Sequence, residues 1–172
     1  MVQTIIDSLA TAAARIEVSS YPSATILPRF PRSIQLDYYS CGAKSVYTVL
    51  RYFKKSCTTK SVERELNTDY EGTAISDMKR VFKRFRLDCR SLRKPGLNDL
   101  KCPITEGCPV LISTWDHEHY CVVFGYSRDH IFVANPSLDI SPEGVGALWC
   151  AVPKRRFLRM WDRDGLVISR PQ

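Results

Sequence analysis

The sequence predicts an α+β domain with a mainly helical first half and an antiparallel sheet in its second half. Apolar residues recur at helical spacing up to about residue 85, and short runs of β-branched and aromatic residues follow from about residue 110. Helices followed by strands in this order are typical of the α+β class. The chain of 172 residues is long enough for one domain with a sizeable core.

Residues 1–30 are predicted to form an N-terminal amphipathic helix and a connector. A single domain is predicted to cover residues 31–172. Apolar residues from Val2 to Ile16 lie on one helical face, and three prolines follow in the connector. The Ala-rich start has no early positive charge, and Asp7 interrupts it, so we do not interpret it as a secretory signal. No apolar stretch approaches the roughly 18 residues of a membrane span, so a soluble, cytoplasmic protein is expected.

Three further helices are predicted in the first half. They cover residues of about 41–55, 59–66 and 74–85. Ser40 is expected to cap the first of them, which leaves Cys41 in its first turn. In the third, one face is expected to carry Ile75, Met78, Phe82 and Phe85.

The second half has the composition of strands. β-rich runs occupy residues of about 87–92, 110–115, 120–126, 131–134, 147–152 and 166–169. A short helix over 157–161 is predicted between the last two.

The charge and the cysteines exclude several classes of function. The net charge is +7, but the basic residues mostly occupy polar faces of predicted helices without a nucleic-acid-binding motif. A solvated basic surface is therefore predicted, with an acidic or membrane-proximal partner as an alternative. Seven cysteines without a secretory signal argue against a disulfide framework. His117, His119 and Cys121 have the alternation of a strand face, but no fourth ligand is visible, so we expect no metal and no cofactor.

A predicted hairpin places a histidine beside an amide. If residues 126–129 form the turn between the strands at 120–126 and 131–134, paired residues have numbers that sum to about 255. His119 then lies beside Asn135 or Pro136. Opposed residues in an antiparallel pair have Cβ atoms about 5 Å apart, which lets an imidazole and a carboxamide hydrogen-bond. The register therefore predicts an oriented histidine.

Four residues together fit thiol-based acyl transfer. Cys41 stands at a helix N-terminus, where the partial positive charge favours a thiolate. His119 is predicted to move the proton, and Asn135 to fix the imidazole tautomer. Gln35, six residues before Cys41, is predicted to donate to the oxyanion. Each residue alone has a more ordinary interpretation, as a packed thiol, a structural histidine, a turn residue or a surface amide.

The chain resembles the bacteriocin-processing, double-glycine-leader peptidase family of papain-like cysteine proteases from about Pro31 to Ile168. The resemblance lies in Q-L-D-Y-Y-S-C-G-A-K-S, G-C-P-V-L-I-S, H-Y-C-V-V-F-G-Y, A-N-P-S and R-F-L-R-M-W. It implies a papain-like fold, with Cys41 as nucleophile, His119 as general base and acid, and Gln35 as oxyanion donor. The family usually has Asp-Pro where this chain has Asn135-Pro136, which removes a negative charge beside the histidine.

The sequence thus predicts a thiol protease, a hydrolase that cleaves peptide or isopeptide amide bonds in a peptide or protein substrate. Many family members are fused to membrane transporters, whereas this sequence implies a free-standing peptidase. The papain-like arrangement implies a site between the two halves, and Trp115, Asp116 and His117 are candidates to line it or are simply a packed loop. A thiol acyltransferase with the same residues and a catalytically weak peptide-binding module are the alternatives. The sequence makes no prediction of the oligomeric state.

Overall fold

The computed structural model describes residues 20–21, 23–137 and 148–171. The predicted N-terminal helix lies outside the described residues. The division of the chain at residue 30 stays a prediction.

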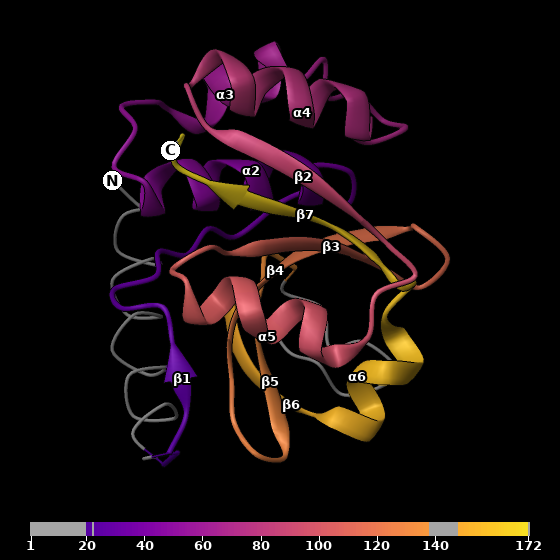
Figure 1. The fold of residues 1–172 in the computed structure, drawn as a ribbon. Coiled ribbons are helices and arrows are strands. Elements are labelled where there is room, and N and C mark those ends of the chain that lie inside the picture. Colours follow the sequence, from indigo (N-terminus) through magenta and orange to yellow (C-terminus); the bar gives the residue numbers. More distant parts are fainter. Residues whose placement is uncertain (1–19, 22, 138–147, 172) are drawn as a thin grey trace.

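The described residues form an α+β fold, as the sequence predicts (Figure 1). The helices are α2 (Cys41–Tyr52), α3 (Thr59–Glu65), α4 (Ile75–Arg84), α5 (Leu97–Thr105) and α6 (Lys154–Met160). The strands are β1 (Thr25–Ile26), β2 (Asp88–Arg93), β3 (Val110–Thr114), β4 (His119–Tyr126), β5 (His130–Asn135), β6 (Leu148–Pro153) and β7 (Asp164–Ser169). The strands pair antiparallel in the order β2-β7-β3-β4-β5-β6, with β1 added to β4.

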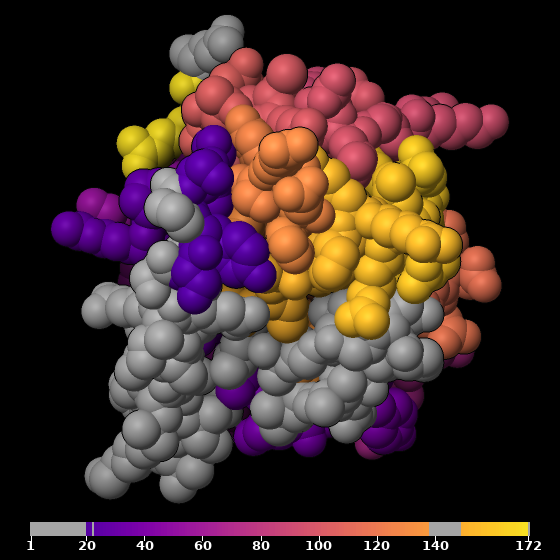
Figure 2. Space-filling model, turned by 90° about the horizontal axis from the view of Figure 1, so that it is seen from below, coloured from indigo at the N-terminus to yellow at the C-terminus, as the bar shows by residue number. Residues whose placement is uncertain are grey.

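Four of the helices lie in two groups around this sheet. Figure 1 shows α3 and α4 above β2 and β7, whereas α5 and α6 lie lower, beside the strands β3 to β6. The view from below in Figure 2 places the indigo connector, the orange β4–β5 hairpin and the yellow α6 side by side. Strand β1 pairs with β4, and the Lys154 N–H donates to the Asp129 carbonyl at 2.9 Å. Strand β1 and the start of α6 thus both pack against the central hairpin.

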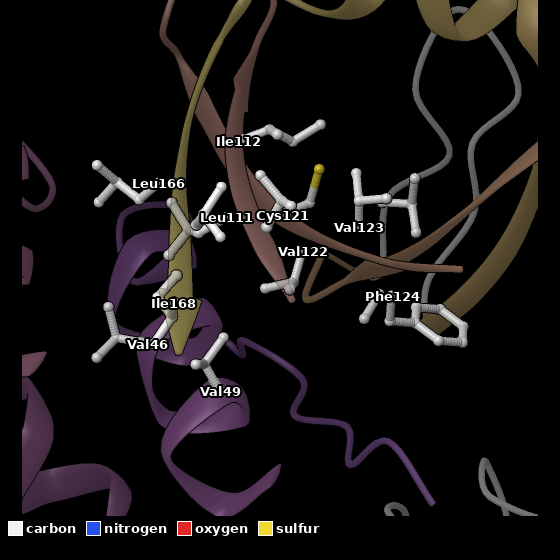
Figure 3. Close-up of a cluster of buried hydrophobic side chains, with 14 of the residues drawn as sticks. Val46, Val49, Leu111, Ile112, Cys121, Val122, Val123, Phe124, Leu166 and Ile168 are labelled. Atoms are coloured by element: carbon white, nitrogen blue, oxygen red, sulfur yellow. The ribbon is translucent and has the colours of Figure 1, made fainter. Parts of the chain in front are cut away.

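The core lies where α2 packs on the sheet. Val46, Val49 and Leu50 of α2 have no exposed surface and belong to the same buried cluster as the apolar side chains of β3, β4 and β7. Figure 3 shows Val46 and Val49 in this cluster with Leu111, Val122 and Ile168. A buried Leu or Val side chain contributes about 1.5–3 kcal/mol through the hydrophobic effect. The sequence periodicity that predicted this helix is therefore the pattern of its buried face.

The first turn of α2 is held from two sides. The buried Ser45 hydroxyl donates to the Tyr120 carbonyl of β4 at 3.1 Å. On the other side, a Cβ added at Gly42 would stand 2.7 Å from Met78 Cε and 2.8 Å from Thr73 Cβ. Glycine at position 42 thus lets α2 approach α4 closely.

Three sequence predictions about individual elements were wrong or incomplete. Ser40 precedes α2, but its side chain makes no capping bond, and its hydroxyl donates to Asp37. Ile75 is 36% exposed, since it begins α4 and the buried face starts at Met78. Helix α6 begins at Lys154 rather than 157, directly after Pro153.

Two elements were not predicted at all. Helix α5 forms despite Pro103 in its interior, because Leu100 and Ile104 are buried and the Asp99 carboxylate accepts the Gly96 N–H at 2.7 Å. Strand β1 is only two residues long and lies against Gly125, where an added Cβ would stand 2.9 Å from the Thr25 carbonyl. Both depend on contacts with distant segments rather than on local periodicity.

No helix in the described part of the chain is long and apolar enough to cross a membrane.

Candidate active site

Cys41 is the first residue of α2 and is buried against β4. Burial raises the pKa of its thiol, and the main-chain N–H groups of Tyr120, Gly42 and Cys41 itself oppose that rise. The Tyr120 amide therefore lies at the sulfur, while the carbonyl of the same residue accepts the Ser45 hydroxyl one helical turn further along. These contacts place the thiol next to the residue that follows His119.

The loop before Cys41 is fixed by one carboxylate. Asp37 accepts the main-chain N–H groups of Tyr39 and Ser40 at 3.0 and 2.7 Å, and the Ser40 hydroxyl at 2.8 Å. Partial burial acts to raise the pKa of Asp37, but the hydrogen bonds from Ser40 and Tyr39 leave it lowered. Asp37 thus holds the loop that leads into α2.

His119 and Asn135 form a hydrogen bond of 2.7 Å between Nε2 and Oδ1. The Ser137 main-chain N–H also points at this Asn135 atom, at 3.1 Å. A main-chain N–H can only donate, so the atom that receives both is the carboxamide oxygen. His119 therefore carries its proton on Nε2, and its Nδ1 is unprotonated and able to act as a base.

The predicted His119–Asn135 contact is present, but the register that predicted it was wrong. Val122 pairs with Ala134, and the register shifts between Val123 and Gly125 through an irregularity in β4. Continued toward the site, this register puts Asn135 opposite Cys121 rather than beside His119. The bond is a diagonal one, which long side chains on one face of a sheet can span.

Gln35 lies beside this pair. Its main-chain N–H donates to the Pro136 carbonyl at 2.9 Å, which fastens the segment before α2 to the residue after Asn135. Its side-chain Nε2 donates to the Asp37 carbonyl at 2.8 Å. Because that partner is an acceptor, the amide nitrogen must face it, and the second N–H of the same nitrogen remains as a donor.

Burial makes both reactive groups neutral at rest. It raises the pKa of the Cys41 thiol and lowers the pKa of His119, and the Asn135 hydrogen bond only partly opposes the second effect. Both shifts disfavour a thiolate–imidazolium pair. The arrangement is suited to proton transfer during attack rather than to a standing ion pair.

Trp115, Asp116 and His117 form the turn between β3 and β4, and all three have left-handed backbone angles, with φ of 57°, 58° and 68°. Such a conformation costs about 1–2 kcal/mol for each non-glycine residue. The Trp115 ring lies 5.7 Å from the His119 ring between centroids. The turn thus brings Trp115 to the candidate site, whereas Asp116 and His117 are exposed.

The strained turn is held by a carboxylate outside it. Asp162, which follows α6, accepts the N–H groups of Asp116 and His117 at 3.0 and 2.9 Å. The Ser113 hydroxyl donates to the Asp164 carboxylate at 2.8 Å. Because its proton is used in that bond, its oxygen accepts the hydrogen bond from His117 Nδ1 at 2.8 Å. His117 is therefore engaged in the turn and is not part of the β4 strand, where the metal interpretation placed it.

A cavity of about 180 Å³ opens beside these residues, between α4 and the strands β2, β3 and β7. Tyr120, Ser113 and Asp164 contribute to its wall. Among the described residues, no group of three or more His, Cys, Asp or Glu side chains is arranged to hold a metal ion. All seven cysteines lie in the described residues, and none of them forms a disulfide bond.

Three residues that shape the site were not predicted from the sequence, namely Asp37, Tyr120 and Asp162. Asp37 and Asp162 act by accepting main-chain N–H groups in loops, and Tyr120 contributes its own main-chain groups. No periodic pattern marks such contacts. The one available signal was at Asp37. A carboxylate that accepts the main-chain N–H groups two and three residues later is typical of Asx-type turns.

The sequence of this chain is similar to known peptidase sequences. Residues 29–169 match the sequence model of the peptidase C39 family. The lactococcin-G-processing and transport ATP-binding protein LagD of Lactococcus lactis subsp. lactis is 23% identical over 135 residues. That match covers 72% of this chain, and the chain spans only 19% of that relative's length.

Two solved structures share the fold. A double glycine motif protease from an AMS/PCAT transporter, solved with its leader peptide, has a TM-score of 0.66 at 17% identity and covers 85% of this chain and 98% of its own. The peptidase domain of Streptococcus ComA has a TM-score of 0.69 at 17% identity and covers 83% of this chain and 100% of its own.

Replacing Asp162 by Ala should loosen the strained turn. Two main-chain N–H groups lose their acceptor, so we expect the free energy of unfolding to fall by about 1–3 kcal/mol. Hydrogen exchange at the Asp116 and His117 amides should accelerate. Urea unfolding and amide exchange measure the two effects. The control Asp88→Ala removes an exposed carboxylate from β2 and should change stability by less than about 0.5 kcal/mol. Equal exchange rates in the two variants would contradict the assignment.

Proposed function

We propose that this chain, which belongs to the peptidase C39 family, is a cysteine-type peptidase that hydrolyses peptide or isopeptide amide bonds through Cys41, His119, Asn135 and Gln35. The observation that supports this most directly is the His119–Asn135 hydrogen bond with its fixed donor and acceptor. It leaves His119 Nδ1 as a base on the strand against which the Cys41 thiol is buried.

The proposed reaction begins with attack of the Cys41 sulfur on the amide carbonyl carbon. His119 Nδ1 takes the thiol proton as the carbon–sulfur bond forms, and the carbonyl oxygen becomes an oxyanion. The second N–H of Gln35 Nε2 donates to that oxyanion. His119 then gives its proton to the leaving amine, and the carbon–nitrogen bond breaks to leave an acyl-enzyme.

Water completes the cycle. His119 Nδ1 takes a proton from the water as its oxygen attacks the thioester carbon. The carbon–sulfur bond then breaks, the acid product leaves, and Cys41 recovers its proton from the imidazolium. Asn135 keeps the ring in one orientation through both steps, since its oxygen holds Nε2–H while Ser137 holds the oxygen.

We propose a peptide as the substrate class. The transporter protease that shares this fold was solved with a leader peptide bound. In this chain the cavity next to Tyr120 and the Trp115 ring beside His119 provide apolar and polar surface on which a peptide can lie.

The test of this function is cleavage of candidate peptides followed by mass spectrometry. The wild-type protein should produce two fragments whose masses sum to the peptide plus one water, and Cys41→Ala should produce none. Cys102→Ala, which removes an exposed thiol on α5, should cleave like the wild type. Cleavage by Cys41→Ala at the wild-type rate would refute the proposal.

Gln35→Ala should lower turnover by about 10²–10³ while the Michaelis constant changes little, because one donor to the oxyanion is removed. Steady-state kinetics on a cleaved peptide measure this. Asn98→Ala removes an exposed amide from α5 and serves as the control. If Gln35→Ala keeps the wild-type turnover, Gln35 has no part in the mechanism.

Asn135→Asp should change the pH dependence of Cys41 alkylation. The added carboxylate favours the imidazolium and so raises the pKa of His119. The imidazolium in turn favours the thiolate, so alkylation by iodoacetamide should begin at a pH lower by about one unit or more. Mapping the adducts by mass spectrometry separates Cys41 from Cys89, whose thiol has a pKa raised to about 11 by burial.

The opposite substitution provides the control. Asn135→Ala removes the acceptor without adding charge, so it should lower turnover but leave Cys41 alkylation without a shift to lower pH. Superimposable profiles for the wild type and Asn135→Asp would mean that another group orients His119.

A further inference from the structure

A second hollow lies at the other end of α2. Its volume is about 1040 Å³, and its walls come from the C-terminal end of α2, the connector before α2, strand β2, the segment before β3 and the end of β7. Helix α2 rises about 1.5 Å per residue, so the ten residues from Cys41 to Arg51 put this groove roughly 15 Å from the thiol. It is therefore separate from the candidate active site.

The groove has a strong excess of positive charge. Arg29, Arg51, Lys54, Arg90 and Arg170 line it, and Glu106 is the one carboxylate among its described lining residues. All five cations are exposed, and none of them takes part in the ion pairs formed within the described part of the chain. The groove thus holds an excess of four positive charges within a chain whose net charge is +7.

Helix electrostatics explain only part of this cluster. Arg51 and Lys54 stand at the C-terminal end of α2, where cations stabilise the helix dipole. Arg29, Arg90 and Arg170 come from three other segments and have no such role at this helix end. Their convergence brings like charges together with Glu106 as the one carboxylate among the described lining residues, and such an excess of positive charge is the arrangement expected of a site for an anionic ligand.

The aromatic residues of the groove indicate which kind of anion fits. Tyr52 packs its ring against Phe30 and Phe53, at 5.2 and 5.0 Å between centroids, and its hydroxyl donates to the Gly107 carbonyl at 3.1 Å. Phe53 itself is buried. Single-stranded nucleic acids bind by stacking bases on exposed aromatic rings, whereas Phe53 is buried and the half-buried Tyr52 ring packs against Phe30 and Phe53. Four of the five cations are arginines, whose planar guanidinium groups bind carboxylates and phosphates in a bidentate manner.

We propose that this groove binds an acidic peptide segment, with Asp and Glu carboxylates held by Arg29, Arg51, Arg90 and Arg170. Its volume lies at the upper end of the range for ligand sites and exceeds what a single inorganic anion needs. The binding requires neither the thiol nor the imidazole. It stands independently of the proposed peptidase mechanism and assigns the protein a second peptide-binding surface.

The experiment measures fluorescence anisotropy with a labelled short oligoglutamate peptide at low salt. A length-matched oligoglutamine peptide and a single-stranded oligonucleotide of equal charge are the comparison ligands. The protein is used as wild type, as Cys41→Ala, as the groove variant Arg51→Gln/Arg90→Gln, and as the control variant Arg64→Gln/Arg86→Gln. The two double variants lose the same charge, and the control residues are exposed cations outside the groove.

The expected result is binding of oligoglutamate by the wild type and by Cys41→Ala with equal affinity. The groove variant should bind about tenfold more weakly or worse, and the control variant should change by less than about twofold. Oligoglutamine should not bind. Equal losses in the two double variants would overturn the proposal, because they would mean a diffuse attraction to net charge. Tighter, groove-dependent binding of the oligonucleotide would overturn it in favour of a nucleic-acid site.

Discussion

The contact between the first turn of α2 and the Tyr120 peptide group of β4 is the constraint on which the rest of the candidate site depends. The Tyr120 N–H lies at the Cys41 sulfur, and its carbonyl accepts the Ser45 hydroxyl. A buried polar group left without its partner costs about 1–3 kcal/mol, so this peptide group fixes where α2 lies along β4. The buried apolar face of α2 stabilises its packing on the sheet, and the polar contact determines its position there.

The elements that the sequence predicted well are those whose pattern is local. Helix α2 and strands β3 to β5 bury continuous apolar faces, and the spacing of apolar residues on these faces can be recognised within each short stretch of sequence. The parts that were missed or wrong depend on distant partners. The register of β4 on β5 changes at an irregularity between Val123 and Gly125, and nothing in the two strands' own composition marks it. Helix α5 forms around Pro103 because Leu100 and Ile104 find buried positions.

The candidate site shows the same division. Cys41, His119, Asn135 and Gln35 were predicted from residue type and order. The contact between His119 and Asn135 follows from antiparallel geometry even though the predicted register was one residue off, whereas the placement of Cys41 depends on the packing of α2 on β4. The electrostatics were less predictable. A helix N-terminus suggested a lowered thiol pKa, yet burial against β4 outweighs the main-chain dipoles and raises it. Only the depth of the thiol in the folded chain decides which effect is larger.

The separation of the two halves of the site along the chain has a consequence for biosynthesis. Cys41 and His119 are 78 positions apart, and β4 has to dock on α2 before their side chains can meet. A ribosome releases α2 well before it has made β4, and domains generally fold as units during synthesis. The nascent chain therefore carries a thiol with no base beside it. Under the proposed mechanism, its own unfolded segments, and those of chains made nearby, do not meet an activated Cys41 thiol until the sheet has closed.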